Sequence, residues 1–182
     1  MQKKFKVLSL IIFVFMFIFA AIYGLHALSV GQAVGSLKLI NPDDNPKWIP
    51  GIGSKVVTIM YTDPDVKDIN DPLSDAIKAK NYPKAKYQGI GIANCKDTWI
   101  PNAGIRMAAR KKEKQFKGSV ILLDEDRTVS TKWGLGDCDG AAVVIVVGKD
   151  KKVKFVKKIK NKGQSKGIIA EVLKILDEET KK

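Results

Sequence analysis

The chain has 182 residues and a formal net charge of +13 at pH 7, because 32 lysines and arginines outnumber 19 acids. This length suits a single domain that buries a sizeable core. The only histidine is His26 and the only cysteines are Cys95 and Cys138, so the composition excludes a conventional Cys/His zinc site.

Residues 1–27 have the pattern of an export signal. Three lysines within the first six residues precede an apolar run from Val7 to Leu25, and Ala27 is a small residue suited to a cleavage point. The run is alternatively an uncleaved anchor, because about 20 apolar residues span a bilayer. In both cases the N-terminal segment inserts in the membrane during export, and residues 28–182 form a periplasmic domain.

The basic charge limits the class of partner. Export makes nucleic acid an unsuitable partner, which leaves an anionic membrane surface or an acidic envelope protein. The alternative is that the lysines only form a solvated face that keeps the protein soluble. No cofactor is predicted from any motif of the chain.

Strands and helices alternate along the predicted domain. A turn-rich loop is expected at 41–50, and the segment after Asp124–Arg127 fits either a short strand or a short helix. β-branched or continuously apolar runs predict strands at 37–40, 56–61, 87–94, 119–123, 141–147 and 153–157. Capping and stop residues predict helices at 71–82, with Asp71 as N-cap, at 101–117 and at 165–179.

This order predicts the fold class. A β-α-β unit is followed by an antiparallel β-β-α unit, which favours an α/β domain with one mixed sheet and helices on both faces. No internal repeat or low-complexity linker divides residues 28–182.

The chain resembles the YtfJ-type family of exported thioredoxin-like proteins. The resemblance rests on the order and spacing of "VGQAV", "YTDPDVKDIND", "YQGIGIAN", "IPNAGIR" and "VVIVVGKDKKV". It implies a thioredoxin-like fold and a periplasmic location, without a defined activity.

The resemblance also shows what is missing. Catalytic thioredoxin-like proteins carry a C-x-x-C pair or a peroxidatic cysteine in the turn after the first core strand, where a helix N-terminus lowers the thiol pKa. Here the turn reads "TDPDVKDINDP". The cis-proline that faces the reactive sulfur in thioredoxins is replaced by Ala141 or Ala142. We therefore expect a non-catalytic binding or scaffold protein.

Four acids occupy this turn instead, namely Asp63, Asp65, Asp68 and Asp71. They fit helix capping and turn formation, since Asp accepts backbone N–H bonds and is favourable at a helix N-terminus. Alternatively they bind a hard cation, which would make the protein a metal-binding accessory protein, or form a docking surface for a basic or polar partner.

The two cysteines are the basis of the remaining alternative function. Cys95 follows the strand at 87–94 and Cys138 precedes the antiparallel strand at 141–147, so the topology places both at the same edge of the sheet, roughly 10 Å apart. They are either two independent thiols or a disulfide, and in the latter case the protein is an atypical thiol-disulfide oxidoreductase. Trp99 and Trp133 lie near them, and we expect both to pack in the core rather than to stack on a ligand.

Overall fold

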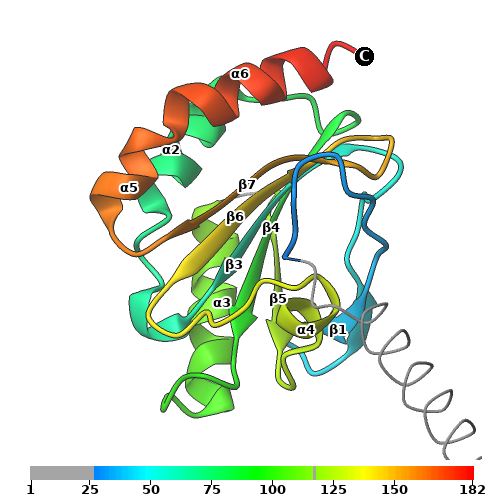
Figure 1. The fold of residues 1–182 in the computed structure, drawn as a ribbon. Coiled ribbons are helices and arrows are strands. Elements are labelled where there is room, and N and C mark those ends of the chain that lie inside the picture. Colours follow the sequence, from blue (N-terminus) through cyan, green and yellow to red (C-terminus); the bar gives the residue numbers. More distant parts are fainter. Residues whose placement is uncertain (1–26, 117) are drawn as a thin grey trace, which may run out of the picture.

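A seven-stranded mixed sheet organises the molecule (Figure 1). The computed structural model describes residues 27–116 and 118–182. The strands lie in the order β2-β1-β5-β4-β3-β6-β7. Their bounds are Lys38–Ile40 (β1), Pro46–Trp48 (β2), Val56–Thr62 (β3), Tyr87–Asn94 (β4), Val120–Asp124 (β5), Ala142–Val147 (β6) and Val153–Ile159 (β7).

The strands at the centre of the sheet are those whose sequences are continuously apolar. β3 pairs with β4 in parallel and with β6 in antiparallel register, and all six residues of β6 are buried. A strand buried on both faces needs apolar side chains on both, which the run "AVVIVV" supplies. β7 lies at one edge, where its lysines face water.

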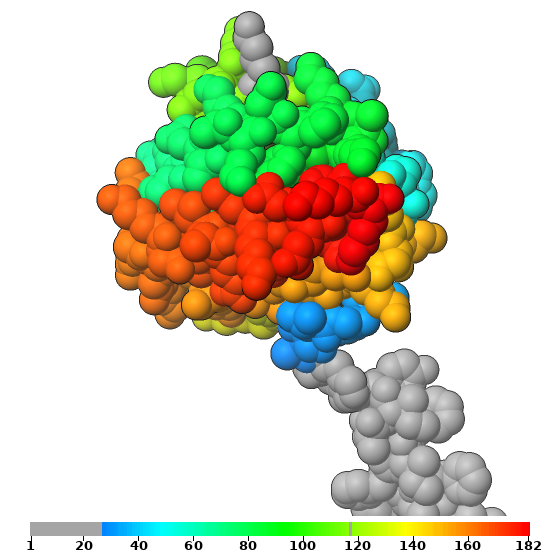
Figure 2. Space-filling view, turned by 90° about the horizontal axis from the view of Figure 1, so that it is seen from above, coloured from blue at the N-terminus to red at the C-terminus, as the bar shows by residue number. Residues whose placement is uncertain are grey.

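The two faces of the sheet are covered differently. Helices α2 (Asp71–Lys80), α3 (Asn102–Gln115), α5 and α6 cover one face. The short α4 and the leader, the segment before β3 (residues 28–55), lie on the other (Figure 1). Seen from above, the C-terminal helix lies beside α2, and the leader emerges on the opposite side of the sheet (Figure 2). The helices are η1 (Pro64–Val66), α2 (Asp71–Lys80), α3 (Asn102–Gln115), α4 (Thr128–Lys132), α5 (Lys162–Gly167) and α6 (Ile169–Glu179).

Each face of the sheet has its own apolar core. On the α4 side, Ile59 and Tyr61 pack with Trp133 and leader residues such as Leu39. On the other side, residues of β3 and β6 pack against α2 and α6. The alternation of side chains along β3 therefore decides which side chains meet the helices and which meet the leader.

Three local expectations need correction or completion. Residues 46–48, expected as loop, form β2, because their backbone pairs with β1 at the sheet edge. The helix predicted at 165–179 is two helices, α5 and α6, which meet at Ile168. The segment left open after the Asp124–Arg127 turn is the helix α4.

The proposed signal or anchor lies outside the described residues. Within residues 27–116 and 118–182, no helix is both long and apolar enough to cross a membrane.

Candidate functional site

The turn after β3 lies at the carboxyl edge of the sheet, where redox relatives place their thiolate. Its first acid, Asp63, is fully buried. The Asp63 carboxylate accepts N–H bonds from Asp65 at 2.9 Å and from Gly140 at 2.7 Å. The Asp63 N–H in turn donates to the carbonyl of Ala141 at 3.0 Å. The turn is therefore bonded to the loop before β6, at the position where thioredoxins carry their proline.

Burial raises the pKa of Asp63, and the two N–H bonds that it accepts oppose this shift. A carboxylate held in this way is a structural group. Its first bond also caps η1, as the acid-rich turn predicts.

The other three acids have separate partners. Asp65 accepts a hydrogen bond from the Thr98 hydroxyl at 2.9 Å. Asp71 and Asp68 face Lys112 of α3, with N–O distances of 2.7 Å and 3.7 Å. The four carboxylates do not converge, and the described residues contain no group of three or more His, Cys, Asp or Glu that could hold a metal ion.

The prediction that Asp71 is an N-cap is wrong. Asp71 is the first residue of α2, and the N-cap position belongs to Asn70, whose side chain makes no capping bond. The Asn70 amide donates to Thr62 Oγ1 at 2.7 Å instead, and the Asp71 carboxylate is taken by Lys112. Lys112 of α3 is thus the partner of Asp71, which was expected to cap its own helix, α2.

Both cysteines lie at this edge, on either side of β3, and both are free. Cys95 is half-buried and its thiol donates to the Ala93 carbonyl at 3.5 Å. Burial, together with the negative charges of Glu125 and Asp124, raises the pKa of the Cys95 thiol to about 12. Burial also raises the pKa of Cys138, against the nearby charge of Lys158.

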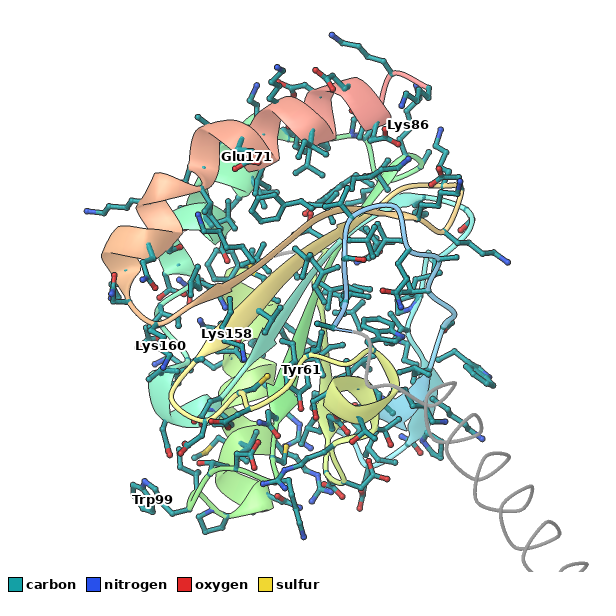
Figure 3. All side chains as sticks on the ribbon, viewed as in Figure 1. Tyr61, Lys86, Trp99, Lys158, Lys160 and Glu171 are labelled. Atoms are coloured by element: carbon teal, nitrogen blue, oxygen red, sulfur yellow. The ribbon has the colours of Figure 1, made fainter. Side chains whose placement is uncertain are left out.

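The sequence did not predict a polar network that lies beside the cysteines. Asp124 is fully buried and accepts N–H bonds from Thr128 and Val129 at 2.8 and 2.9 Å, so it anchors the start of α4. Burial raises its pKa, although those two bonds oppose the shift. The hydroxyl of Tyr61 (Figure 3) is buried close to Ser130 and Asp124 but forms no hydrogen bond of good geometry with either, and burial raises its pKa. An acid shortly before a predicted helix was the signal that could have identified Asp124.

The loop after β4 is tied into the same network. Arg127 Nε donates to Asp97 at 2.7 Å, and the Asn94 amide donates to the other oxygen of Asp97. Partial burial works against ionisation of Asp97, but the hydrogen bonds from Arg127 and Asn94 and the charge of Arg127 hold its pKa below the usual value. Nothing in the local sequence pairs Asp97 with Arg127.

The two tryptophans differ. Trp133 is in the core, as predicted, but Trp99 is 84 % exposed, so the expectation of core packing is wrong for Trp99. Figure 3 shows Trp99 projecting from the carboxyl edge, away from the body of the molecule. The reason is the neighbouring Thr98, whose hydroxyl binds Asp65 and the Ile100 N–H, which leaves the intervening side chain outward.

Comparison with known proteins shows the family to which the chain belongs. The model of YtfJ_HI0045, described as a bacterial protein of unknown function, matches residues 51–179. The chain belongs to this family. An uncharacterized protein of Haemophilus influenzae is 35% identical over 92 residues, and the match covers 50% of this chain and 49% of that protein. The chain thus spans about half the length of the curated relative it matches.

Solved structures similar to this YtfJ-family chain have the thioredoxin-like fold. A candidate thiol:disulfide interchange protein, DsbE, from Chlorobium tepidum has a TM-score of 0.60 at 14% identity, over 82% of this chain and 99% of that one. A thiol peroxidase from Chromobacterium violaceum has a TM-score of 0.60 at 13% identity, over 84% and 88%. An exposed lipoprotein thioredoxin from Streptococcus pneumoniae has a TM-score of 0.55 at 14% identity, over 79% and 99%. At these identities the likeness shows the fold alone.

Proposed function

We propose that this YtfJ-family protein is an exported, non-catalytic binding protein that uses the carboxyl edge of a thioredoxin-like sheet for docking. The observation that carries the proposal is the role of Asp63. Where redox relatives place a thiolate, this chain places a buried carboxylate whose oxygens are taken by the N–H groups of Asp65 and Gly140. That arrangement stabilises a turn and offers no nucleophile.

The thiols support the same proposal. A thiolate is the species that attacks a disulfide or a peroxide. The raised pKa values of Cys95 and Cys138 keep both groups protonated at neutral pH. Cys138 is also buried. Catalysis by these cysteines would need an environment that lowers their pKa, whereas burial acts in the opposite direction.

Trp99 supports a docking role. An exposed tryptophan has a large apolar surface, and aromatic residues are enriched at interfaces. The loop that carries Trp99 is held by Thr98 and Asp97, so the side chain is presented from a fixed base. An envelope protein with an apolar pocket fits the Trp99 side chain, and an acidic envelope protein fits the net charge of the chain, +13.

Export supports the periplasm as the place of action. Residues 1–27 have the composition of a signal or anchor, and one similar structure is an exposed lipoprotein thioredoxin.

A paired experiment tests the proposal. Insulin reduction and peroxide turnover are measured with a thiol reductant, for the parent and for the Cys95→Ala, Cys138→Ala double variant. We expect both proteins to stay at background. Turnover that depends on the cysteines, with a reversible Cys95–Cys138 bond, would instead establish the atypical oxidoreductase.

Docking is tested by capture from an envelope fraction. Trp99→Ala should lose the captured partner, whereas Trp48→Ala, which removes an exposed tryptophan from the edge strand β2, should retain it. Equal capture by both variants would contradict docking at the carboxyl edge.

A further inference from the structure

A groove of about 530 Å³ lies between α2 and α3 on the helix-covered face of the sheet, and one end of it reaches the carboxyl-edge turn at Thr62 and Asn70. Its floor is β4, where Gly89, Gly91 and Ala93 face the helices and contribute almost no side chain. Ile77 of α2 and Ala108 and Ile105 of α3 line its sides. The Ile121 side chain of β5 lies over Gly91, with its Cδ1 2.6 Å from a Cβ built there, and the apolar trough above has a size typical of small-molecule sites.

Two lysines bridge the trough. Lys78 of α2 donates to the carbonyl of Gln115 at 3.3 Å and lies 5.5 Å from the centre of the Phe116 ring. Lys112 of α3 reaches back to the start of α2, where it pairs with Asp71. These contacts hold α2 and α3 apart at a fixed spacing without filling the space over β4.

Three hydroxyls gather at the amino end of the groove, around Gly89. A Cβ built on Gly89 would lie 3.3 Å from the Tyr87 hydroxyl and 3.4 Å from Ser119 Oγ. Thr58, which is paired with Gly89 across the β3–β4 ladder, contributes the third hydroxyl. Lys55 and Lys84 line the same end of the groove, and neither forms an ion pair among the described residues.

The Thr58 hydroxyl points to a ligand. Thr58 is 1 % exposed, and its Oγ1 has no partner with hydrogen-bond geometry. The nearest polar group is the Tyr87 phenol, whose pKa burial raises to about 12 while the neighbouring Thr58 hydroxyl opposes the shift. At the opposite end, Asn70 is 4 % exposed and its Oδ1 is likewise without a partner. A buried polar atom without a partner destabilises the fold, and such atoms are uncommon outside sites that receive a ligand or water.

From these features we propose that the groove binds a medium-chain fatty acid carboxylate. The carboxylate accepts hydrogen bonds from Thr58 and its neighbouring hydroxyls and is neutralised by Lys55 and Lys84. The acyl chain lies against Ile121, above Gly91, between α2 and α3. Asn70, bonded to Thr62, forms the polar boundary at the far end, and Thr62 lies about 13 Å from Thr58 along β3, which favours a chain of medium length.

The experiment is isothermal titration calorimetry of the full mature protein with decanoate, decanol and palmitate. Decanoate should bind, and both decanol, which lacks the charge, and palmitate, which exceeds the trough, should bind more weakly. Thr58→Val should weaken decanoate binding about tenfold or more. The same substitution should not lower the melting temperature, because it removes an unpartnered buried hydroxyl.

Two further variants separate the head-group end from the chain end. Lys55→Gln with Lys84→Gln should weaken binding and reduce its salt dependence, while Lys157→Gln with Lys160→Gln, on or next to β7, should change neither. Gly91→Val should abolish binding, because its Cβ would lie 2.6 Å from Ile121 Cδ1 and would displace the Ile121 side chain into the groove. No binding of decanoate, equal binding of decanol, or binding unaffected by Thr58→Val would overturn the proposal. None of these outcomes bears on docking through Trp99, because the Trp99 side chain does not line the groove.

Discussion

Asp63 places a structural carboxylate at the carboxyl edge of a thioredoxin-like sheet, where redox proteins of this fold have a reactive cysteine. Its carboxylate connects the turn after β3 with the loop before β6, through bonds to Asp65 and Gly140. In a redox protein these two segments face each other across a reactive sulfur. Here a backbone-bonded carboxylate joins them, so the residue contributes stability instead of reactivity.

The raised pKa of Asp63 predicts the direction in which the stability of the protein changes with pH. Its raised pKa means that the folded state binds this proton more tightly than the unfolded chain does. The stability that this group contributes is therefore full below the unfolded pKa of about 4 and is lost as the pH rises through the folded pKa. Asp63→Asn has no such group, so the difference in unfolding free energy, parent minus variant, should shrink as the pH rises above about 4. Urea unfolding across this range measures it, and a difference that grows with pH would show a lowered pKa.

Cys95 gives a second prediction at the same scale. With a thiol pKa of about 12, it holds far less thiolate at mildly alkaline pH than a free cysteine does. A thiol pKa of about 12 instead of 9.0 leaves about a thousandfold less thiolate, and the greater nucleophilicity of that thiolate offsets part of this, so alkylation of Cys95 by iodoacetamide should be at least about a hundredfold slower than that of a free thiol. Mass spectrometry follows the reaction, with the protein in denaturant as the control in which both thiols react. Alkylation of native Cys95 at the free-thiol rate would contradict the buried environment.

At the scale of elements, the acids before α2 divide into one structural group and several surface groups. Asp63→Ala should cost about 1–3 kcal/mol, because it leaves two N–H groups unsatisfied in a buried turn. Asp71→Ala should cost only about 0–1 kcal/mol, because it removes a partly exposed ion pair with Lys112 and no helix cap. Denaturant unfolding of the two variants compares them directly. A larger loss for Asp71→Ala would restore the capping role that the sequence predicts for it.

Element boundaries show where local patterns are sufficient. β3 and β6 were predictable because a continuous apolar run fits a strand that is covered on both faces. β2 was not, because "PKW" carries no strand pattern and pairs only where the chain folds back along β1. The division between α5 and α6 also escaped prediction, since the apolar stripe continues through Ile168.

For the whole molecule, we expect the N-terminal segment to decide where the domain acts. Residues 1–27 lie almost entirely outside the described part, so their role is a prediction from composition. We expect a mature protein beginning near Leu28 in the soluble periplasmic fraction. N-terminal sequencing of the native protein checks this, and an intact Met1 in the membrane pellet would indicate an anchor at residues 7–25.

The sequence by itself determined the fold class, the order of the main strands and helices, and the absence of a cysteine from the turn after β3. These follow from periodicity, stop signals and residue identity within a few positions of the chain. Only the tertiary structure decided the partners: Lys112 reaches Asp71 across 41 positions, and Gly140 reaches Asp63 across 77. It also decided the exposure of Trp99 and the groove over Gly91, because these depend on how loops and helices pack around the sheet. A local pattern specifies which side chains are available, but the path of the whole chain specifies which of them meet.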